Sequence, residues 1–546
     1  MVNDKKSKRI HLEIQTHRKN PIGVFRTTYY DKGKVLHDNL GSLTGLDLDM
    51  LKMIQATLQG ATVMKSDFHI KSGKEHGASF VFLSIAKDTG LDKMIYSRTS
   101  EQWVKDVLAM VAGRAVYGGS KLALTRVNST STLWEQVGIY EDDIDVDVHC
   151  YDPMDILFAR QNTIQRNLAK KHLTDGVLIL YDMTSTYLEG EYSDSELAGF
   201  GYNRDKKKGH KQINIGLLCN KDGCPVAVKV FKGGEKDSQT VREQIELIKK
   251  DFGLKDIVFV GDRGMVTQAR LNDMAPGKEH SMLKISALTH SRIKKLCSES
   301  ETVQLSLFDE KQPIEIVLPD KPDMRYALCL NPIRAQKEKQ TRLEMIEKTR
   351  RKLDEIASPK KKTDDGKLGV RVGKLIANSK VGKFFDIKIQ DAKVYYTVNE
   401  SKVAEEEQFD GHYVIFTDVP SEQMTIQEVV DSYRALVNVE QAFRNLKSPT
   451  LEVRPVYHRI DDRIRCHVFL CMLSYYLLWH MKQRLKPLFE NDFTGRNKEY
   501  TVEHVINILR NIQKQNVEFQ GVESTFISDA NDEQKKILDL LKIKLV

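Results

Sequence analysis

Two aspartates follow apolar runs of the kind that form buried β-strands. Asp182 comes after the run VLILY, and Asp262 comes after the run IVFVG. Neither run alternates between apolar and polar residues, which indicates neighbouring central strands covered on both faces. Carboxylates at the ends of two adjacent strands lie close together and repel each other unless a cation sits between them. Because Mg²⁺ binds carboxylate oxygens and substrate phosphates, the pair is a candidate divalent-metal site; two unrelated loop aspartates are the alternative.

A third carboxylate, Glu440, lies in a predicted helix that begins after Thr425. Tyr433, Glu440 and Lys447 are seven residues apart, and seven steps of about 100° bring each side chain within about 20° of the last. The three therefore share one stripe of the helix, beside its apolar face. A Glu and a Lys that face a core are costly without partners or a ligand. We expect Glu440 to meet the two aspartates; a surface pair of Glu440 and Lys447 is the alternative.

Between the two aspartates, the sequence predicts two further strands and a helix. Segments 211–220 and 224–234 flank a turn at 221–223 and predict a β-hairpin. Residues 238–253 carry apolar residues at helical spacing. The predicted order is strand, strand, strand, helix, strand, which makes an α/β core whose first and last strands carry the aspartates.

A basic loop follows the first of these strands. Its basic residues are Arg204, Lys206, Lys207, Lys208, His210 and Lys211. A single acid, Asp205, interrupts them. A basic loop beside a metal site is suited to tracking phosphates; a solvated hairpin tip is the alternative for any one of these lysines.

The composition is that of a soluble globular protein. Of the 546 residues, 40% are hydrophobic and 29% are charged, and the net charge of +8 permits an anionic partner. Seven scattered cysteines form no CxxC pair, which argues against a zinc site and a disulfide framework and favours a reducing cytoplasm. The N-terminus lacks the apolar core of a signal peptide, and the longest apolar run, Val468–Trp479, is too short to span a bilayer.

The order and spacing of these features resemble a DDE transposase, and more specifically the bacterial insertion-sequence-four family. The resemblance covers about Tyr181 to Leu478 and includes the segments KVFKGG, GDRG and RPVYHRIDDRIRCHVFLCML. It implies an α/β, ribonuclease-H-like mixed sheet flanked by helices and interrupted by a mainly β insertion. The helical pattern from Ser100 to about Lys171 separately predicts a mostly helical N-terminal region, in which no family motif is matched. The family usually carries an Arg three residues after the Tyr, where this chain has Leu436. Arg434 or Arg444 would then replace it, or that DNA contact is absent.

The resemblance implies phosphodiester hydrolysis and transesterification at transposon ends. Asp182, Asp262 and Glu440 would hold two Mg²⁺ or Mn²⁺ ions, and Tyr433 and Lys447 would contact the DNA backbone. Further candidate DNA-binding residues are Arg434, Arg444, Arg204, Lys206, Lys207, Lys208, Arg454 and His458. For Arg454 and His458, ordinary surface ion pairing is the alternative.

The implied partners are double-stranded DNA, as transposon terminal repeats and as target, and a second copy of the chain, since two ends require two active sites. The implied location is the bacterial cytoplasm, at the nucleoid. A ribonuclease-H-like nuclease that cuts without joining, or a domesticated DNA-binding protein that has lost its chemistry, are the competing functions.

The sequence predicts five regions along the chain. They are an N-terminal region for DNA-end binding or dimerisation (1–172), the first part of the catalytic core (173–290), a β-rich insertion (291–420), the second part of the core with the Glu440 helix (421–485) and a C-terminal helical region (486–546). Within the first region, the short apolar run at 78–86 predicts a strand.

Overall fold

The computed structural model places most of the chain. It describes residues 9–16, 20–31, 34–59, 68–173, 178–205, 207–235, 237–254, 257–262, 265, 282–299, 312–358, 364–449, 451–489, 500–519 and 522–545. The chain divides into two compact units. The larger comprises 85–124 and 145–483, and the smaller comprises 1–84, 125–144 and 484–546. Among the described helices, none combines the length and apolar character that a membrane crossing needs.

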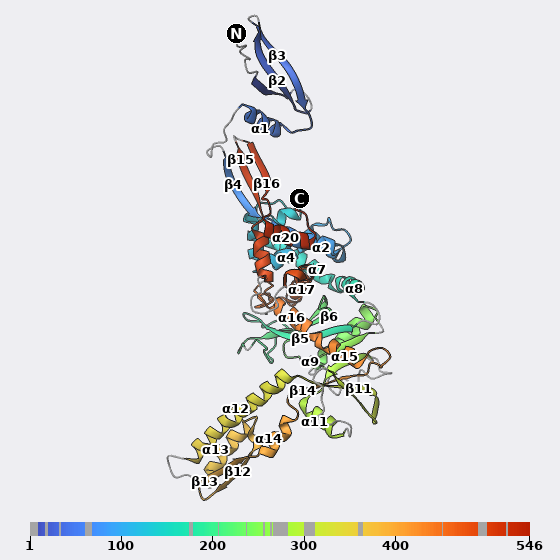
Figure 1. The fold of residues 1–546 in the computed structure, drawn as a ribbon, viewed down its shortest axis with the longest axis vertical. Helices are drawn as coiled ribbons and strands as arrows, with labels where there is room; N and C mark the ends of the chain where they lie inside the picture. The colour runs from blue at the N-terminus through green and yellow to red at the C-terminus, as the bar shows by residue number, and fades with distance from the viewer. Residues whose placement is uncertain are drawn as a thin grey trace, which may run out of the picture. The chain divides into compact units, whose positions relative to one another are not determined.

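The larger unit is built on an eight-stranded mixed sheet in the order β10-β11-β14-β9-β8-β5-β6-β7 (Figure 1). Its strands are β5 (Leu178–Tyr187), β6 (Gln212–Asn220), β7 (Pro225–Lys232), β8 (Val258–Gly261), β9 (Leu283–Ala287), β10 (Ile314–Leu318), β11 (Lys321–Leu330) and β14 (His412–Thr417). β8 is parallel to both β5 and β9. With α9 (Asp237–Glu246) between β7 and β8, the predicted order of strands and helix and the pairing of the two aspartate-bearing strands are confirmed.

The register of β5 and β8 brings the two aspartates together. Tyr181 pairs with Gly261, so the next residue on each strand is an aspartate. Asp182 lies within β5 and not at its end, which differs from the prediction. The reason is that β5 continues beside the antiparallel strand β6, from Met183 opposite Gly216 onward, after β8 has ended.

The helix predicted after Thr425 is two consecutive helices, α15 (Ile426–Arg434) and α16 (Leu436–Leu446). Thr425 caps the first: its Oγ1 accepts from Glu428 N at 3.3 Å, and Thr425 N donates to the Glu428 carboxylate at 2.8 Å. α16 packs against β5 and β6 through buried apolar residues. This packing carries Glu440 to the strand that holds Asp182.

Further helices of the larger unit surround this core. They are α3 (Leu91–Ile95), α4 (Gln102–Tyr117), α7 (Asp152–Ala159), α8 (Gln161–His172), α11 (His290–Glu299) and the long α17 (Asp461–Arg484), whose middle is buried. α8 packs on β7, the outermost strand on that side of the sheet.

The segment expected to be a mainly β insertion is largely helical. It contains α12 (Pro332–Ala357), α13 (Asp365–Ala377) and α14 (Glu400–Glu407) around a two-stranded sheet of β12 (Phe385–Gln390) and β13 (Lys393–Val398). These elements share an apolar core that includes Leu353, Leu368 and Val372. β10, β11 and β14 join the large sheet instead. α13 was not predicted because its three glycines are weak helix formers; its buried residues four apart, Leu368 and Val372, hold it in place.

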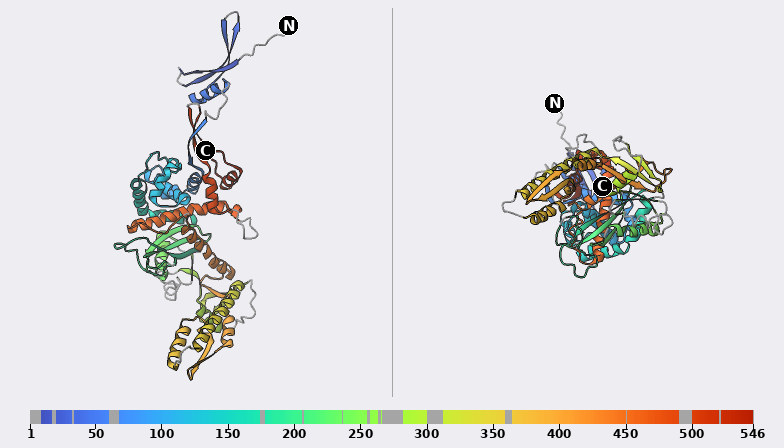
Figure 2. Two further views of the ribbon diagram at one scale, coloured as in Figure 1. Left: turned by 90° about the vertical axis from the view of Figure 1, so that its left-hand side faces the viewer. Right: turned by 90° about the horizontal axis from the view of Figure 1, so that it is seen from below.

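The smaller unit combines segments from both ends of the chain. β1 (Arg9–Gln15), β2 (Ile22–Asp31) and β3 (Lys34–Leu43) form an antiparallel sheet, and α1 (Leu48–Leu58) packs on β1 (Figure 2). β4 (Phe68–Glu75) pairs with β15 (Gln513–Phe519), which pairs with β16 (Val522–Ile527). The C-terminal region is therefore part β, and not only the helices α19 (Val502–Arg510) and α20 (Asp532–Leu541).

The strand predicted at 78–86 is wrong, because this run forms the helix α2 (Gly77–Asp88). A continuous apolar run has neither period 2 nor a clear period 3.6, and a strand and a buried helix cannot be told apart by such a pattern. Burial on several sides, at Ala78, Val81, Phe82 and Ile85, explains why the run is apolar throughout.

Candidate active site

Asp182, Asp262 and Glu440 line one pocket of about 350 Å³. β5 carries Asp182, the residue directly after β8 is Asp262, and α16 carries Glu440. The other lining residues are Asn331, Arg334, Tyr413, Tyr433, Arg434, Leu436 and Val437. The structure thus brings together three carboxylates that are separated by 80 and 178 residues in the sequence.

The charges of Asp262 and Glu440 act on the carboxylate of Asp182. Burial raises the pKa of Asp182 to about 6; the charges of Asp262 and Glu440 add to this rise, while the Met183 amide and Arg204 oppose it. Met183 N donates to Asp182 Oδ1 at 2.7 Å. Like charges so placed disfavour ionisation unless a cation is bound among them. An all-oxygen set of this kind fits a hard divalent ion such as Mg²⁺ or Mn²⁺.

The residues of the predicted helix stripe go to two different places. The Tyr433 hydroxyl lies 3.4 Å from Asp262 Oδ1, and Glu440 is 3.7 Å from Arg444, one turn later on α16. Lys447 instead ends α16, where its ammonium donates to the Ser185 carbonyl at 2.7 Å and to Asp205 at 3.0 Å. Tyr433 and Glu440 therefore share the pocket, and Lys447 binds the loop after β5.

Asp205 forms a buried ion cluster with two of the predicted DNA-binding residues. Its side chain is 6% exposed and pairs with Lys447 and with Arg454. Arg204, the preceding residue, donates from its amide to Ser185 Oγ at 2.9 Å and from its guanidinium to the Met183 carbonyl. The start of the basic loop thus folds back onto β5, close to Asp182. The sequence shows Asp205 only as an acid among lysines, and gives no sign of these pairings.

The remaining predicted DNA-binding residues are scattered. The Lys207 ammonium lies 5.5 Å from the centre of the Tyr187 ring, Lys208 is exposed, and Lys206 lies outside the described residues. His458 packs against the rings of Tyr151 and His467. Burial lowers the pKa of His458 to about 3, so this ring is neutral at physiological pH and supplies no positive charge for a phosphate.

Two arginines line the pocket with the acids. Arg434 donates to the Tyr413 hydroxyl at 3.1 Å. Arg334 comes from the first turn of α12, where Asn331 caps the helix by accepting from Arg334 N at 3.0 Å. Sequence reasoning missed Asn331, Arg334 and Tyr413. The only local signal was the Asn-Pro pair that begins α12, which marks a helix start without linking it to the acids.

Comparison with known proteins identifies the family of the chain. The family model of the transposase DDE domain matches residues 174–477, more than half of the chain, and this range includes all three acids. No curated protein sequence matches the chain. Among solved structures, a piggyBac transposase synaptic complex with hairpin DNA is 8% identical, with an alignment that covers 79% of this chain and 78% of that one, at a TM-score of 0.34. That score is too low to carry an argument.

Proposed function

The chain belongs to the family of proteins with a transposase DDE domain, and from this premise we propose that it cuts DNA at transposon ends and joins the cut ends to target DNA. The observation that carries the proposal is the meeting of Asp182, Asp262 and Glu440 in one pocket. Phosphoryl transfer needs positioning and charge neutralisation more than covalent chemistry. Carboxylates beside arginines are suited to both tasks.

We propose that Asp182, Asp262 and Glu440 hold two Mg²⁺ or Mn²⁺ ions. When bound, such ions activate the attacking water or DNA 3′-hydroxyl and neutralise charge on the leaving oxygen. The elevated pKa of Asp182 supports this assignment, because burial and the charges of Asp262 and Glu440 disfavour its ionised form unless a cation is bound nearby. Tyr433 and Arg434 would orient the DNA backbone at the same pocket, and Arg434 would take the place of the family arginine that is Leu436 here.

The cluster around Asp205 would bind the phosphate next to the cut. Arg204, Lys447 and Arg454 supply three positive charges for the single carboxylate of Asp205. This excess positive charge lies against β5, at Met183 and Ser185, which follow Asp182 on the strand. In this proposal Lys206, Lys207 and Lys208 continue the DNA path, and Arg444 balances the charge of Glu440.

We propose that the core has a ribonuclease-H-like fold. The order β7-β6-β5-β8-β9 supports this, because it places the first three strands as an antiparallel meander and the next two parallel to the first. The chain between β9 and α15 would then be the insertion, which contributes three strands to the sheet and the helical lobe of α12, α13 and α14. Residues 1–172 would bind DNA ends or mediate dimerisation.

The test uses the DNA that flanks the gene. A marker bracketed by both flanks, on a donor plasmid, should be excised and inserted into a target plasmid by the wild-type protein with Mg²⁺. Asp182→Asn, Asp262→Asn and Glu440→Gln should each abolish both steps. Glu355→Gln, an exposed acid of α12 outside the pocket, is the matched control and should remain active.

A pre-cut end with a free 3′-hydroxyl separates the competing functions. Joining of this end to target DNA supports the transposase, whereas cutting without joining would identify a nuclease on the same fold. DNA binding without either reaction would identify a protein that has lost its chemistry. We further propose that the protein acts as a homodimer on DNA in the bacterial cytoplasm, at the nucleoid; joining of two ends in one event supports the dimer.

A further inference from the structure

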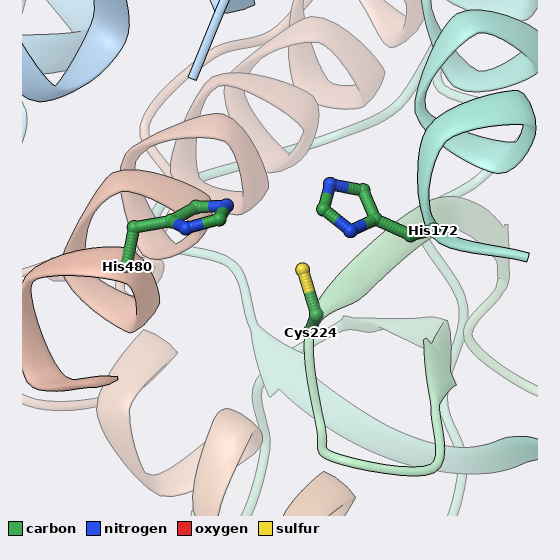
Figure 3. A group of neighbouring side chains, drawn as sticks. All are labelled: His172, Cys224 and His480. Carbon is green, nitrogen blue, oxygen red and sulfur yellow. The ribbon is translucent and has the colours of Figure 1, made fainter. Parts of the chain in front are cut away.

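Two histidines and a cysteine meet in the larger unit, outside the carboxylate pocket. They are His172 at the end of α8, Cys224 in the turn between β6 and β7, and His480 near the end of α17. One nitrogen or sulfur atom from each residue lies within 4.8 Å of the other two, and the three side chains point toward one another (Figure 3). None of the three residues lines the carboxylate pocket.

We propose that His172, Cys224 and His480 bind one Zn²⁺ ion, at a site that is separate from the proposed catalytic metals and independent of the proposed reaction. Imidazole nitrogen and thiolate sulfur are the ligands that Zn²⁺ takes in proteins, whereas Mg²⁺ takes oxygen. Three protein ligands leave one position of a tetrahedral ion for water. The two sites therefore select different metals by the chemistry of their donors.

The spacing of the three residues suits a zinc ion. Zinc bonds of about 2.0 Å to nitrogen and about 2.3 Å to sulfur keep tetrahedral ligand atoms about 3.3–3.7 Å apart. The ligand atoms of the three residues are now up to 4.8 Å apart. Small side-chain movements would bring them into this range. The backbone around the site is already held in place. The Trp479 indole N–H donates to the Asp222 carbonyl at 3.2 Å, which fixes α17 to the turn that carries Cys224.

A chain of hydrogen bonds prepares His172 as a ligand. Thr89 Oγ1 donates to the Ile85 carbonyl at 2.7 Å and is also hydrogen-bonded to the Tyr476 hydroxyl. The Tyr476 hydroxyl lies 2.9 Å from His172 Nε2. In the tautomer in which Nε2 carries the proton and donates to Tyr476, the lone pair is on His172 Nδ1. Metal-bound histidines commonly have their second nitrogen held in this way.

Cys224 must lose a proton when the ion binds. Coordination to the ion would supply the charge that compensates the thiolate. The site would join α8, the β6–β7 turn and α17, three segments far apart in the sequence. The absence of a CxxC pair, which argued against zinc in the sequence, does not bear on a site whose three ligands are brought together by folding.

Cobalt titration of the full-length protein tests the proposal. Metal-free protein is titrated with Co²⁺ in excess Mg²⁺, which occupies the carboxylate pocket, and a sulfur-to-cobalt charge-transfer band reports a cysteine ligand that the carboxylate pocket lacks. We expect one equivalent of Co²⁺ to produce the band and one equivalent of Zn²⁺ to remove it. Cys224→Ser should abolish the band, and His480→Gln should weaken binding at least about tenfold.

Cys219→Ser is the matched control, since Cys219 is also fully buried, lies in the same hairpin and is not part of the cluster; this variant should keep the band. No band in the wild-type protein, or a band that survives Cys224→Ser, overturns the proposal. X-ray absorption at the zinc edge of the wild-type protein needs no variant. It should show one sulfur among nitrogen neighbours, and a shell without sulfur overturns the site even where Cys224→Ser fails to fold.

Discussion

In the Asp205→Asn variant the shape of the side chain is kept and its negative charge is lost. The carboxylate of Asp205 pairs with Lys447 and Arg454, whose side chains are 13% and 32% exposed. Burial lowers the pKa of Lys447, and Asp205 opposes this effect, while Arg454 and Arg204 reinforce it. The substitution therefore leaves a buried lysine among arginines without its counter-charge.

The expected loss of stability depends on which partners of Asp205 can reach water. Removing one member of a buried ion pair costs about 3–5 kcal/mol. Arg454 is partly exposed, and the asparagine oxygen can still accept one hydrogen bond, so we expect the free energy of unfolding to fall by about 2–3 kcal/mol at pH 7. Lys447 has a lower pKa when folded than the ordinary 10.5. The deficit of the variant should therefore shrink as the pH rises towards 10.5, where the unfolded lysine also becomes neutral.

Urea unfolding of a double-mutant cycle measures the effect. Asp205→Asn, Lys447→Met and the double variant are compared with the wild-type protein, and Lys208→Met, an exposed lysine of the same loop, is the control with no expected change. The double variant should be more stable than the sum of the two single losses predicts, by about 2 kcal/mol. An Asp205→Asn protein as stable as the wild type, or strictly additive losses, would refute the buried cluster.

Three further changes probe the pocket and the helical lobe. Glu440→Gln should reduce DNA cleavage to background with unfolding unchanged, since this side chain is 56% exposed. Arg334→Ala should lower the slope of log DNA affinity against log salt by about 1, while the exposed Arg351→Ala, on the same helix, should not. Burial raises the pKa of Glu406, but Lys294 and Lys383 bring it down to about 2, below the ordinary 4.5. This lowering of the pKa stabilises the folded state by about 2 kcal/mol above pH 4.5, and the stabilisation is lost as the pH falls towards 2. Glu406→Gln should therefore be less stable than the wild type above pH 4.5, and the difference should disappear near pH 2.

Each of these expectations can fail in a distinct way. Residual cleavage by Glu440→Gln would remove that acid from the site, and equal salt slopes for the two arginine variants would remove DNA from the Arg334 side of the pocket. For Glu406, a stability difference that stays constant between pH 2 and 7 would show that the pairing with the lysines is energetically neutral.

The sequence could predict the strands and the helical segment that carry the three acids, because the signals of these elements are local and regular. The unbroken apolar runs before Asp182 and Asp262 identify central strands, and the apolar face that follows the cap residue Thr425 identifies the helical segment of Glu440. The contacts of Lys447 could not be predicted in this way. Its partner Asp205 is 242 residues away, and no periodicity links a helix end to a loop after another strand. The same limit applies to Arg334, whose place in the pocket depends on how α12 leaves β11.

The cluster of His172, Cys224 and His480 and the helix α13 show two other limits. Cysteine spacing detects sites built from adjacent ligands, whereas His172 and His480 come to Cys224 from separate helices. Helix propensity argues against α13, but packing of Leu368 and Val372 into a shared core outweighs the weak propensity of its glycines. In both cases the local sequence does not determine the structure, and contacts between distant segments do.

The sheet that joins β4 to β15 has a consequence for synthesis on the ribosome. Glu75 and Arg510, which form an ion pair at 2.9 Å in the smaller unit, are 435 residues apart. At about 5–20 residues per second, β4 emerges roughly 20–90 s before its neighbouring strand exists. Throughout that interval the larger unit can fold while β4 keeps an open edge, so a polypeptide whose translation stops between the two strands would display an unpaired edge that proteases and chaperones recognise.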